Sequence, residues 1–326
     1  MGFRFDSLRV IGLAMLGLAP LLPGAAVAQD WPSKTIRAVV PLTAGSATDQ
    51  IARAVLDPVG SALGQPIVIE NRPGAGNTLG MAQVARSEPD GYTLLVNSSS
   101  HAIVPATYRS LPFDTLRDLK PVIPFVNMPT VLLVSPGKYK TVADLIAAGK
   151  AKPGAMNYSS AGAGNFSHFA TEVFLRAAGV KAVHVPSKGA PEAITEVLAG
   201  RVDFFFAPLL LALSQLRAGK LQALAVTGSQ RASAMPDVPT TKEAGYPDSE
   251  YNFWIGLFAP AKTPEPILQR LHAEAAKALK TEAVQQRLKK FGVDPMPMTA
   301  AAFDKLVREE VAINNKIAKA VGIKAN

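Results

Sequence analysis

The sequence contains no cysteine, and this absence removes several kinds of site together. Without thiols the chain can form no disulfide bond, no thiolate metal site and no cysteine nucleophile. Stability must therefore come from burial of apolar side chains, and 326 residues are enough to build two domains.

Motifs for metal-dependent or nucleotide-dependent chemistry are also missing. The four histidines are scattered singly, whereas a zinc site needs convergent ligands at close spacing. No Walker A motif, Gly-x-Ser-x-Gly elbow or His-Glu-x-x-His motif occurs. The glycine-rich residues 74–80 lack the spacing of a dinucleotide fingerprint, so we interpret them as a tight structural loop. We expect no metal ion and no cofactor.

One apolar run stands close to the N-terminus. Residues 10–22 follow two arginines and precede an Ala-x-Ala cleavage site at residues 26–28, which is the order of a secretory signal peptide. Two prolines interrupt the run, and this disfavours a membrane anchor. We expect residues 1–28 to be removed and the mature protein to begin at Gln29 in the periplasm.

The charge balance is basic, with 34 Lys and Arg against 25 Asp and Glu, and a formal net charge of +9. Nucleic-acid binding would require a dense basic patch, but the basic residues are spread along the chain. Two interpretations stay open. A basic surface could attract anionic solutes by long-range steering, or it could be a solvated surface with no specific role.

Strands and helices alternate along the mature chain. A short β-branched strand at residues 36–40 is followed by a small-residue loop and a helix, and this order recurs, which predicts open α/β sheets flanked by helices. Two long extended runs, residues 122–134 and 251–260, bracket one such series. They predict two crossings between two lobes. We expect lobe 1 to comprise residues 29–127 and 252–326, and lobe 2 to comprise residues 128–251.

Small polar residues follow the strands at residues 43–49, 98–100 and 159–168. Ligands of open α/β sheets collect outside the carboxyl ends of the strands. A helix N-terminus there presents free N–H groups and partial positive charge, which suit a carboxylate. We expect Thr48 or Asp49 to cap the first helix, and the Asp49 carboxylate could then fill the anion site from within.

A rival interpretation is an exported serine hydrolase that uses Ser160 and His168. His168 begins a helix after a glycine-rich loop. At that position its side chain could face a ligand or could have a structural role. No strained elbow exposes the serine as a nucleophile in the local sequence. His184 lies in an apolar strand, so we expect a satisfied core residue.

The ordered motifs together resemble the Bug family, the periplasmic solute-binding receptors of tripartite tricarboxylate transporters. The resemblance implies a two-lobed periplasmic-binding-protein fold, type II-like, that performs no chemistry. Such a receptor closes on a small carboxylate, whether a di- or tricarboxylate, an aromatic acid or an acidic amino acid. The resemblance also implies that the solute is delivered to membrane transporter subunits. We expect a monomer without nucleic-acid partners. The motifs are VPLTAGSATD (40–49), ENRPGAG (70–76), PDGYTLL (89–95), YSSAGAGNFSH (158–168), HVPSKG (184–189), LAGRVD (198–203), LAVTG (224–228), PDVPTTKEAG (236–245) and WIGLFAP (254–260).

The resemblance also implies two carboxylate-gripping loops, at residues 43–49 and 160–165. The chain departs from the family pattern at Leu42 and Ser187, where aromatic residues are usual, and at a Gly-Ser pair in the first loop. Asp203 could receive an amino or hydroxyl group of the solute or could be a solvated turn residue. The expected ligand-binding residues are Thr43, Ala44, Gly45, Ser46, Ala47, Thr48, Asp49, Ser98, Ser99, Ser160, Ala161, Gly162, Gly164, Asn165, His168, Ser187 and Asp203.

Overall fold

The computed structural model describes Met1, Gly2 and residues 31–322. The predicted signal peptide lies almost wholly outside these residues. Within them, no helix is both long and apolar enough to cross a membrane.

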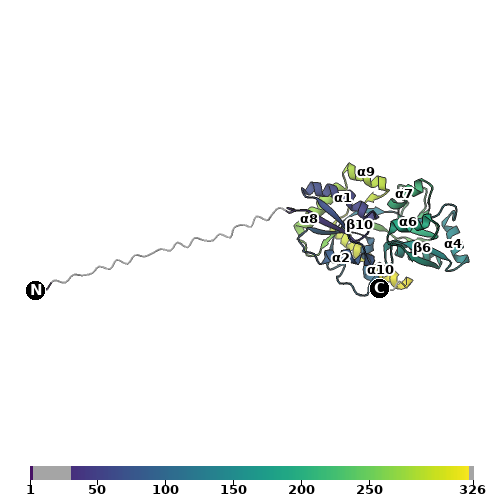
Figure 1. Ribbon diagram of the computed structural model, residues 1–326, viewed down its shortest axis with the longest axis horizontal. Coiled ribbons are helices and arrows are strands. Elements are labelled where there is room, and N and C mark those ends of the chain that lie inside the picture. The colour runs from purple at the N-terminus through teal and green to yellow at the C-terminus, as the bar shows by residue number, and fades with distance from the viewer. Residues whose placement is uncertain (3–30, 323–326) are drawn as a thin grey trace. The chain divides into compact units, whose positions relative to one another are not determined.

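Lobe 1, as we define it, is a six-stranded mixed sheet with the helices packed on it (Figure 1). The strand order is β11-β4-β10-β3-β1-β2, with β1 parallel to β2 and β3, and β10 antiparallel to β3 and β4. The strands are β1 (Ile36–Val40), β2 (Ile67–Asn71), β3 (Thr93–Ser98), β4 (Leu119–Met128), β10 (Phe253–Pro260) and β11 (Asp294–Pro295). Its helices are α1 (Ala47–Leu63), α2 (Thr78–Ala85), α3 (Val104–Thr107), α8 (Glu265–Ala278), α9 (Glu282–Phe291) and α10 (Ala300–Val321), with short 3₁₀ turns η1 (Ala75–Asn77) and η2 (Ser99–Ala102).

Lobe 2 is a five-stranded mixed sheet with order β7-β6-β8-β5-β9. β6 is parallel to β7 and β8, whereas β5 runs antiparallel to β8 and β9. The strands are β5 (Thr130–Val134), β6 (Met156–Ser160), β7 (Ala182–Pro186), β8 (Phe204–Pro208) and β9 (Gln222–Val226). The helices are α4 (Val142–Ala151), α5 (Phe166–Ala178), α6 (Ala190–Leu198) and α7 (Leu209–Arg217). In Figure 1, β10 lies between the lobe 1 helices α1, α2 and α8 and the lobe 2 elements α4, α6 and β6.

The two segments that connect the sheets are tied to each other. The chain passes from β4 to β5 through Pro129 alone, and it returns to lobe 1 before β10. Thr227 joins the segments because its N–H donates to the carbonyl of Thr130 at 2.9 Å and its Oγ1 donates to the carbonyl of Tyr251 at 2.8 Å. These bonds hold the crossing strands side by side. The predicted residue boundaries of the lobes stay a prediction.

Most predicted elements are present, and the extended run at residues 122–134 forms the two strands β4 and β5 in different sheets, as a crossing between lobes requires. Two local expectations are wrong. The N-cap of α1 is Ser46, whose side chain accepts the N–H of Asp49 at 3.3 Å. β7, which carries His184, is an edge strand with partly exposed side chains and not a core strand, because it pairs with β6 alone.

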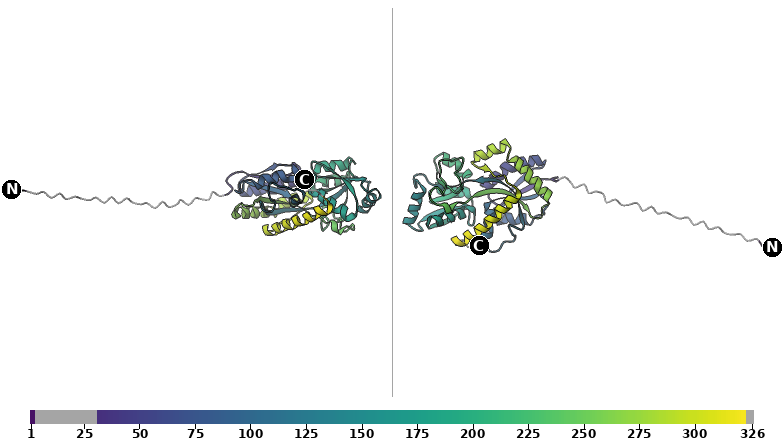
Figure 2. Two further views of the ribbon diagram at one scale, coloured as in Figure 1. Left: turned by 90° about the horizontal axis from the view of Figure 1, so that it is seen from below. Right: turned by 180° about the vertical axis from the view of Figure 1, so that it is seen from behind.

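Helix α10 contacts both lobes. It packs on β4, α3 and η2 of lobe 1 and on α5 of lobe 2, where Arg176 donates to the carbonyl of Ala320 at 2.5 Å. Figure 2 shows this helix, in yellow, running along lobe 1 toward lobe 2. Glu310, on its inner face, accepts the indole N–H of Trp254 at 2.8 Å. Burial raises the pKa of Glu310 to about 7, although the bond from Trp254 acts in the opposite direction.

Replacement of Glu310 by glutamine should stabilise the protein at alkaline pH. The folded-state pKa lies above the ordinary 4.5, so the carboxyl group favours folding at low pH and loses this contribution as the pH rises through about 7. Glu310→Gln keeps an acceptor for Trp254 and removes the ionisation. We expect its free energy of unfolding to exceed that of the unmodified protein by up to about 3 kcal/mol at pH 8, and by much less at pH 5. Urea denaturation at both values measures this.

The matched control is Glu309→Gln, because the Glu309 side chain is 59% exposed and pairs only loosely with Lys305, at 3.8 Å. Its effect on stability should not depend on pH. Equal effects of the two substitutions at pH 8 would contradict a buried, ionisation-sensitive Glu310.

Candidate functional site

A cavity of about 30 Å³ lies where the carboxyl ends of strands from both sheets face each other. Polar side chains, small residues and apolar side chains share its wall, and no charged side chain is among them. Such a position at the ends of the strands is where ligands of open α/β sheets bind. The lining residues are Leu42, Thr43, Ser46, Ala47, Thr48, Ser98, Ala161, Asn165, Phe166, Ser167, Gly189, Ala190, Pro208, Leu211 and Phe253.

The loop between β1 and α1 is held in shape by the Asp49 carboxylate. This side chain is nearly inaccessible to solvent and accepts the N–H of Gly45 at 2.9 Å. Arg53 and Asn71 hold its other oxygen at 3.0 to 3.1 Å. Burial acts to raise the pKa of Asp49, but the bonds from Arg53, Gly45 and Asn71 outweigh it, and the pKa lies below its usual value. Asp49 is therefore an anion at neutral pH, bonded to its own loop.

The first turn of α1 presents N–H groups at the cavity wall. The N–H of Asp49 is bonded to Ser46 Oγ and the N–H of Gln50 to the Ser46 carbonyl. Ala47 and Thr48 precede them in the helix, where no carbonyl of an earlier turn is available to their N–H groups. Both residues line the cavity. The helix thus offers two main-chain donors and its positive end to a solute.

The facing loop after β6 uses most of its donors internally. The N–H of Ala161 donates to Ser167 Oγ at 2.9 Å, and the N–H of Gly162 donates to Ser160 Oγ at 3.2 Å. Asn165 caps α5 by accepting the N–H of Ser167 at 3.0 Å. These bonds shape the loop after β6 and leave few of its own amides free.

A stack of rings supports this second loop from behind. The imidazoles of His168 and His184 are 4.0 Å apart and nearly parallel, and Tyr158 stacks on His184 at 4.9 Å. Nδ1 of His168 accepts the N–H of Gly164 at 3.2 Å. Burial lowers the pKa of His184 to about 4, and burial together with His184 lowers the pKa of His168 to about 3. Both rings are therefore neutral at neutral pH.

Ser160 is paired with His184, not with His168. Its Oγ lies 2.6 Å from Nε2 of His184, and the serine is fully buried behind the loop. Ser160 does not line the cavity. A hydrolytic serine needs an exposed oxygen beside the substrate, so this geometry lacks the main requirement of the hydrolase interpretation.

Beside the cavity the two lobes touch at glycines and through a hydrogen bond. The N–H of Phe166 in lobe 2 donates to Ser100 Oγ in lobe 1 at 3.2 Å. A Cβ added to Gly189 would lie 3.1 Å from Oγ1 of Thr43. A Cβ at Gly164 would lie 3.3 Å from Thr107. Small residues thus permit the close approach that encloses the cavity.

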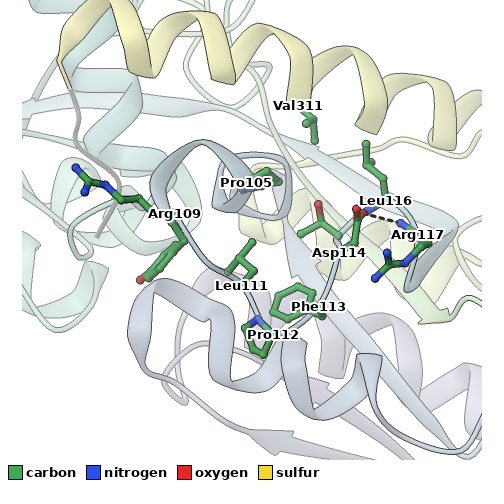
Figure 3. Close-up of a pocket in the computed structure, with 11 residues that line it drawn as sticks. Pro105, Arg109, Leu111, Pro112, Phe113, Asp114, Leu116, Arg117 and Val311 are labelled. Carbon is green, nitrogen blue, oxygen red and sulfur yellow. Dashed lines mark hydrogen bonds between the residues drawn. The ribbon is translucent and has the colours of Figure 1, made fainter.

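A second, larger cavity of about 550 Å³ lies on lobe 1 between α3 and β4 (Figure 3). Two of its three charged lining residues, Asp114 and Arg117, are engaged with their own loop. Asp114 accepts the N–H groups of Leu116 and Arg117, each at 2.9 Å, and Arg117 pairs with Asp118 at 2.8 Å. In the described part of the chain, no cluster of three or more His, Asp or Glu side chains could hold a metal ion. The cleft cavity is the better candidate site.

Comparison with known proteins gives the family. The model of the tripartite tricarboxylate transporter family receptor, TctC, matches residues 51–323. The chain belongs to this receptor family.

Several relatives are similar to this chain along nearly its whole length. Protein BugT of Bordetella pertussis is 33% identical over 305 residues, covering 92% of this chain and 94% of BugT. The structure of Rpa4515 of R. palustris with adipate is 31% identical, with a TM-score of 0.87, and covers 91% of this chain and 100% of that one. MatC of Rhodopseudomonas palustris with bound malate is 34% identical, with a TM-score of 0.83, and covers 88% of this chain and 99% of that one. The two-lobed periplasmic-binding-protein fold is confirmed.

The predicted site residues of this TctC receptor fall into two groups. The cavity wall includes Thr43, Ser46, Ala47, Thr48, Ser98, Ala161 and Asn165. The other predicted residues do not line it: Ala44, Gly45, Asp49, Ser99, Ser160, Gly162, Gly164, His168, Ser187 and Asp203. Asp203 precedes the first residue of β8, whereas the last residue of β8, Pro208, lines the cavity. The Asp203 carboxylate pairs with Lys138 at 2.6 Å. Direct ligand contact by any of them stays a prediction.

Several lining residues escaped the sequence analysis. Pro208, Leu211 and Phe253 come from β8, α7 and β10, and as apolar residues in apolar runs they cannot be told from core residues by pattern. Ser167 lies within the singled-out segment 159–168 but was not chosen as a ligand-binding residue, and Gly189 and Ala190 follow the predicted Ser187 by two and three positions. Leu42, a recognised departure from the family pattern, does line the cavity.

Loss of the Asp49 charge should loosen the first loop. Asp49→Asn would keep the side chain's size but replace the anion that Gly45, Arg53 and Asn71 surround. We expect the free energy of unfolding at pH 7 to fall by about 1 to 3 kcal/mol, because buried hydrogen bonds to a charged group are lost. Asp57→Asn on the exposed face of α1 is the control and should have little effect. Equal stabilities of the two variants in urea denaturation would contradict the role of Asp49.

Proposed function

We propose that this receptor captures a small carboxylate in the cavity between its lobes, without chemistry, and delivers it to the membrane subunits of a transporter. The observation that carries the proposal is the uncharged cavity at the first turn of α1. There the N–H groups of Ala47 and Thr48 and the hydroxyls of Thr43, Ser46 and Ser98 converge. The proposal includes a monomeric receptor that acts in the periplasm.

Neutral donors suit a solute that must be released again. Hydrogen bonds to a charged group contribute about 1.5–3 kcal/mol each, so three or four of them are compatible with micromolar binding, about 8 kcal/mol in total. Closure of the lobes removes water and strengthens these bonds, while opening returns the carboxylate to solvent. The adipate and malate complexes of related receptors support a carboxylate as the ligand class.

A thermal-shift screen tests the ligand class directly. A ligand that binds the folded state at a hundredfold excess over its dissociation constant adds about 2.7 kcal/mol of stability. We expect at least one mono-, di- or tricarboxylate, aromatic acid or acidic amino acid to raise the melting temperature, while the matched amide or alcohol does not. Equal shifts with the acids and their neutral analogues would contradict carboxylate capture.

A larger residue at position 189 tests closure. Gly189 has extended backbone angles that any residue adopts, φ −178° and ψ 170°, so a side chain there causes no local strain. Its Cβ would meet Thr43 across the cleft. We expect Gly189→Val to weaken binding of the best carboxylate from the screen by about tenfold or more, and Gly189→Ala by less.

Calorimetric titration measures these affinities, and the melting temperatures of the unliganded variants serve as the folding control. Unchanged affinity in Gly189→Val would show that binding does not need the contact between the lobes at this point.

The hydrolase interpretation is tested with chromogenic esters. We expect no turnover above that of the Ser160→Ala variant, because Ser160 lies behind the loop. Turnover that this substitution abolishes would contradict a purely binding function.

A further inference from the structure

A groove of about 820 Å³ crosses from one lobe to the other, and it shares no lining residue with the cleft cavity. We call it the basic groove. Lobe 1 forms one wall with α9 and β11, and lobe 2 forms the other with the end of α7 and the loop after β9. Helices α7 and α9 contact each other, and Figure 1 shows them next to each other.

The floor of the basic groove is a close junction between the lobes. A Cβ added to Gly292, which caps α9, would lie 3.1 Å from the Cβ of Ala234 in the loop after β9. Ser233 Oγ and Asp294 Oδ1 are 3.4 Å apart across the same junction. Because the two walls belong to different lobes and meet here, the shape of the groove depends on how the lobes are placed.

Three cations line the groove, against the single carboxylate of Asp294. Lys289 and Lys290 lie in the last turn of α9 and Arg217 in the last turn of α7, where the negative end of the helix dipole favours a cation. All three residues are exposed. The ion pairs in the described part of the chain are formed by other basic residues. The positive charge of the groove is therefore left for a partner.

The other lining groups suit a chain segment better than a small anion. A single exposed cation holds a small anion weakly, because water and salt screen the pair. A segment with several carboxylates can meet all three cations, since its first contact raises the effective concentration of the others. Gln285 and Gln286 add neutral amides that can bond a peptide backbone, and Ala234, Val293 and Pro295 add apolar surface between the charges.

We propose that the basic groove is a docking site for an acidic segment of a protein partner. The carboxylates of the segment meet Arg217 from lobe 2 and Lys289 and Lys290 from lobe 1, so the segment contacts both lobes at once. Docking is complete only while the lobes are closed, and it therefore favours the closed receptor. This inference rests on the proposed function, since delivery of a solute requires a partner that recognises the loaded receptor.

A panel of labelled peptides tests the docking site. Each probe is a short fluorescein-labelled peptide with three glutamates and two leucines at a different spacing, and its matched peptide has glutamine in place of glutamate. We expect fluorescence anisotropy with the mature protein to give at least a tenfold lower dissociation constant for the best acidic peptide than for its match. Equal binding of the matched peptides, or binding of none, overturns the proposal.

Paired charge reversals on lobe 1 locate the site. Lys289→Glu combined with Lys290→Glu should raise the dissociation constant of the best acidic peptide at least tenfold. Lys280→Glu combined with Arg287→Glu is the control, because it changes the net charge equally at two exposed residues that do not line the groove. Equal weakening by the two double variants would indicate attraction by the overall charge of the protein and would overturn the site.

A single reversal tests the wall from lobe 2. Arg217→Glu should weaken peptide binding at least fivefold, whereas Lys220→Glu, exposed just beyond α7 and outside the groove, should not. A glutamate at a helix C-terminus destabilises the helix, so the melting temperature of each variant is measured. Lys289→Gln combined with Lys290→Gln adds no negative charge and should still weaken binding at least threefold.

Coupling to the solute separates this inference from the proposed function. The best carboxylate of the screen, at saturation, should tighten binding of the acidic peptide at least threefold, and the peptide should tighten carboxylate binding by the same factor. Unchanged peptide affinity overturns recognition of the closed receptor and leaves carboxylate capture intact. Peptide binding by a protein that binds no carboxylate overturns the proposed function and retains the docking site.

Vesicles of anionic phospholipid test a different class of partner. We expect them to bind the unmodified protein no better than the control variant Lys280→Glu with Arg287→Glu. Vesicle binding that only the reversals at Lys289 and Lys290 abolish, without binding of the acidic peptides, would assign the groove to a membrane surface and overturn the protein partner.

Discussion

The site depends on one carboxylate that is not the ligand. Asp49 accepts the Gly45 N–H inside the first loop, and Arg53 and Asn71 hold it there. This internal anion fixes the turn that enters α1 and leaves the cavity-facing N–H groups of the first turn to a second anion. A helix N-terminus can stabilise negative charge on more than one side, so the structural and the ligand carboxylate need not compete.

The remainder of the structure positions a second wall opposite that turn. β10 begins at the cavity with Phe253 and joins the lobe 1 sheet, while the bonds of Thr227 hold the returning chain against the start of β5. Glycine at position 189 lets the lobes meet. The stacked imidazoles of His168 and His184 support the facing loop and keep its amides bonded within lobe 2. The result is an enclosure whose wall combines polar groups with apolar side chains.

Local signals in the sequence predicted most of this framework. A β-branched run marked β1, and small-residue loops marked the starts of α1 and α5, because these preferences act within a few residues. The extended run at residues 122–134 was predicted to cross between the lobes, but the partners of its strands were not, since sheet pairing depends on residues distant in the sequence. Leu211 was missed as a cavity residue for a related reason: an apolar side chain in an apolar helix has the same pattern whether it faces core or cavity.

The most direct test of the account is a crystal structure of the mature protein grown with the carboxylate that stabilises it most. We expect the carboxylate oxygens within hydrogen-bond distance of the N–H groups of Ala47 and Thr48, with the lobes closed over the solute. A basic groove lined by Arg217, Lys289 and Lys290 is the alternative location for an anion. A carboxylate bound there, with the cavity at α1 filled by water alone, would contradict the account.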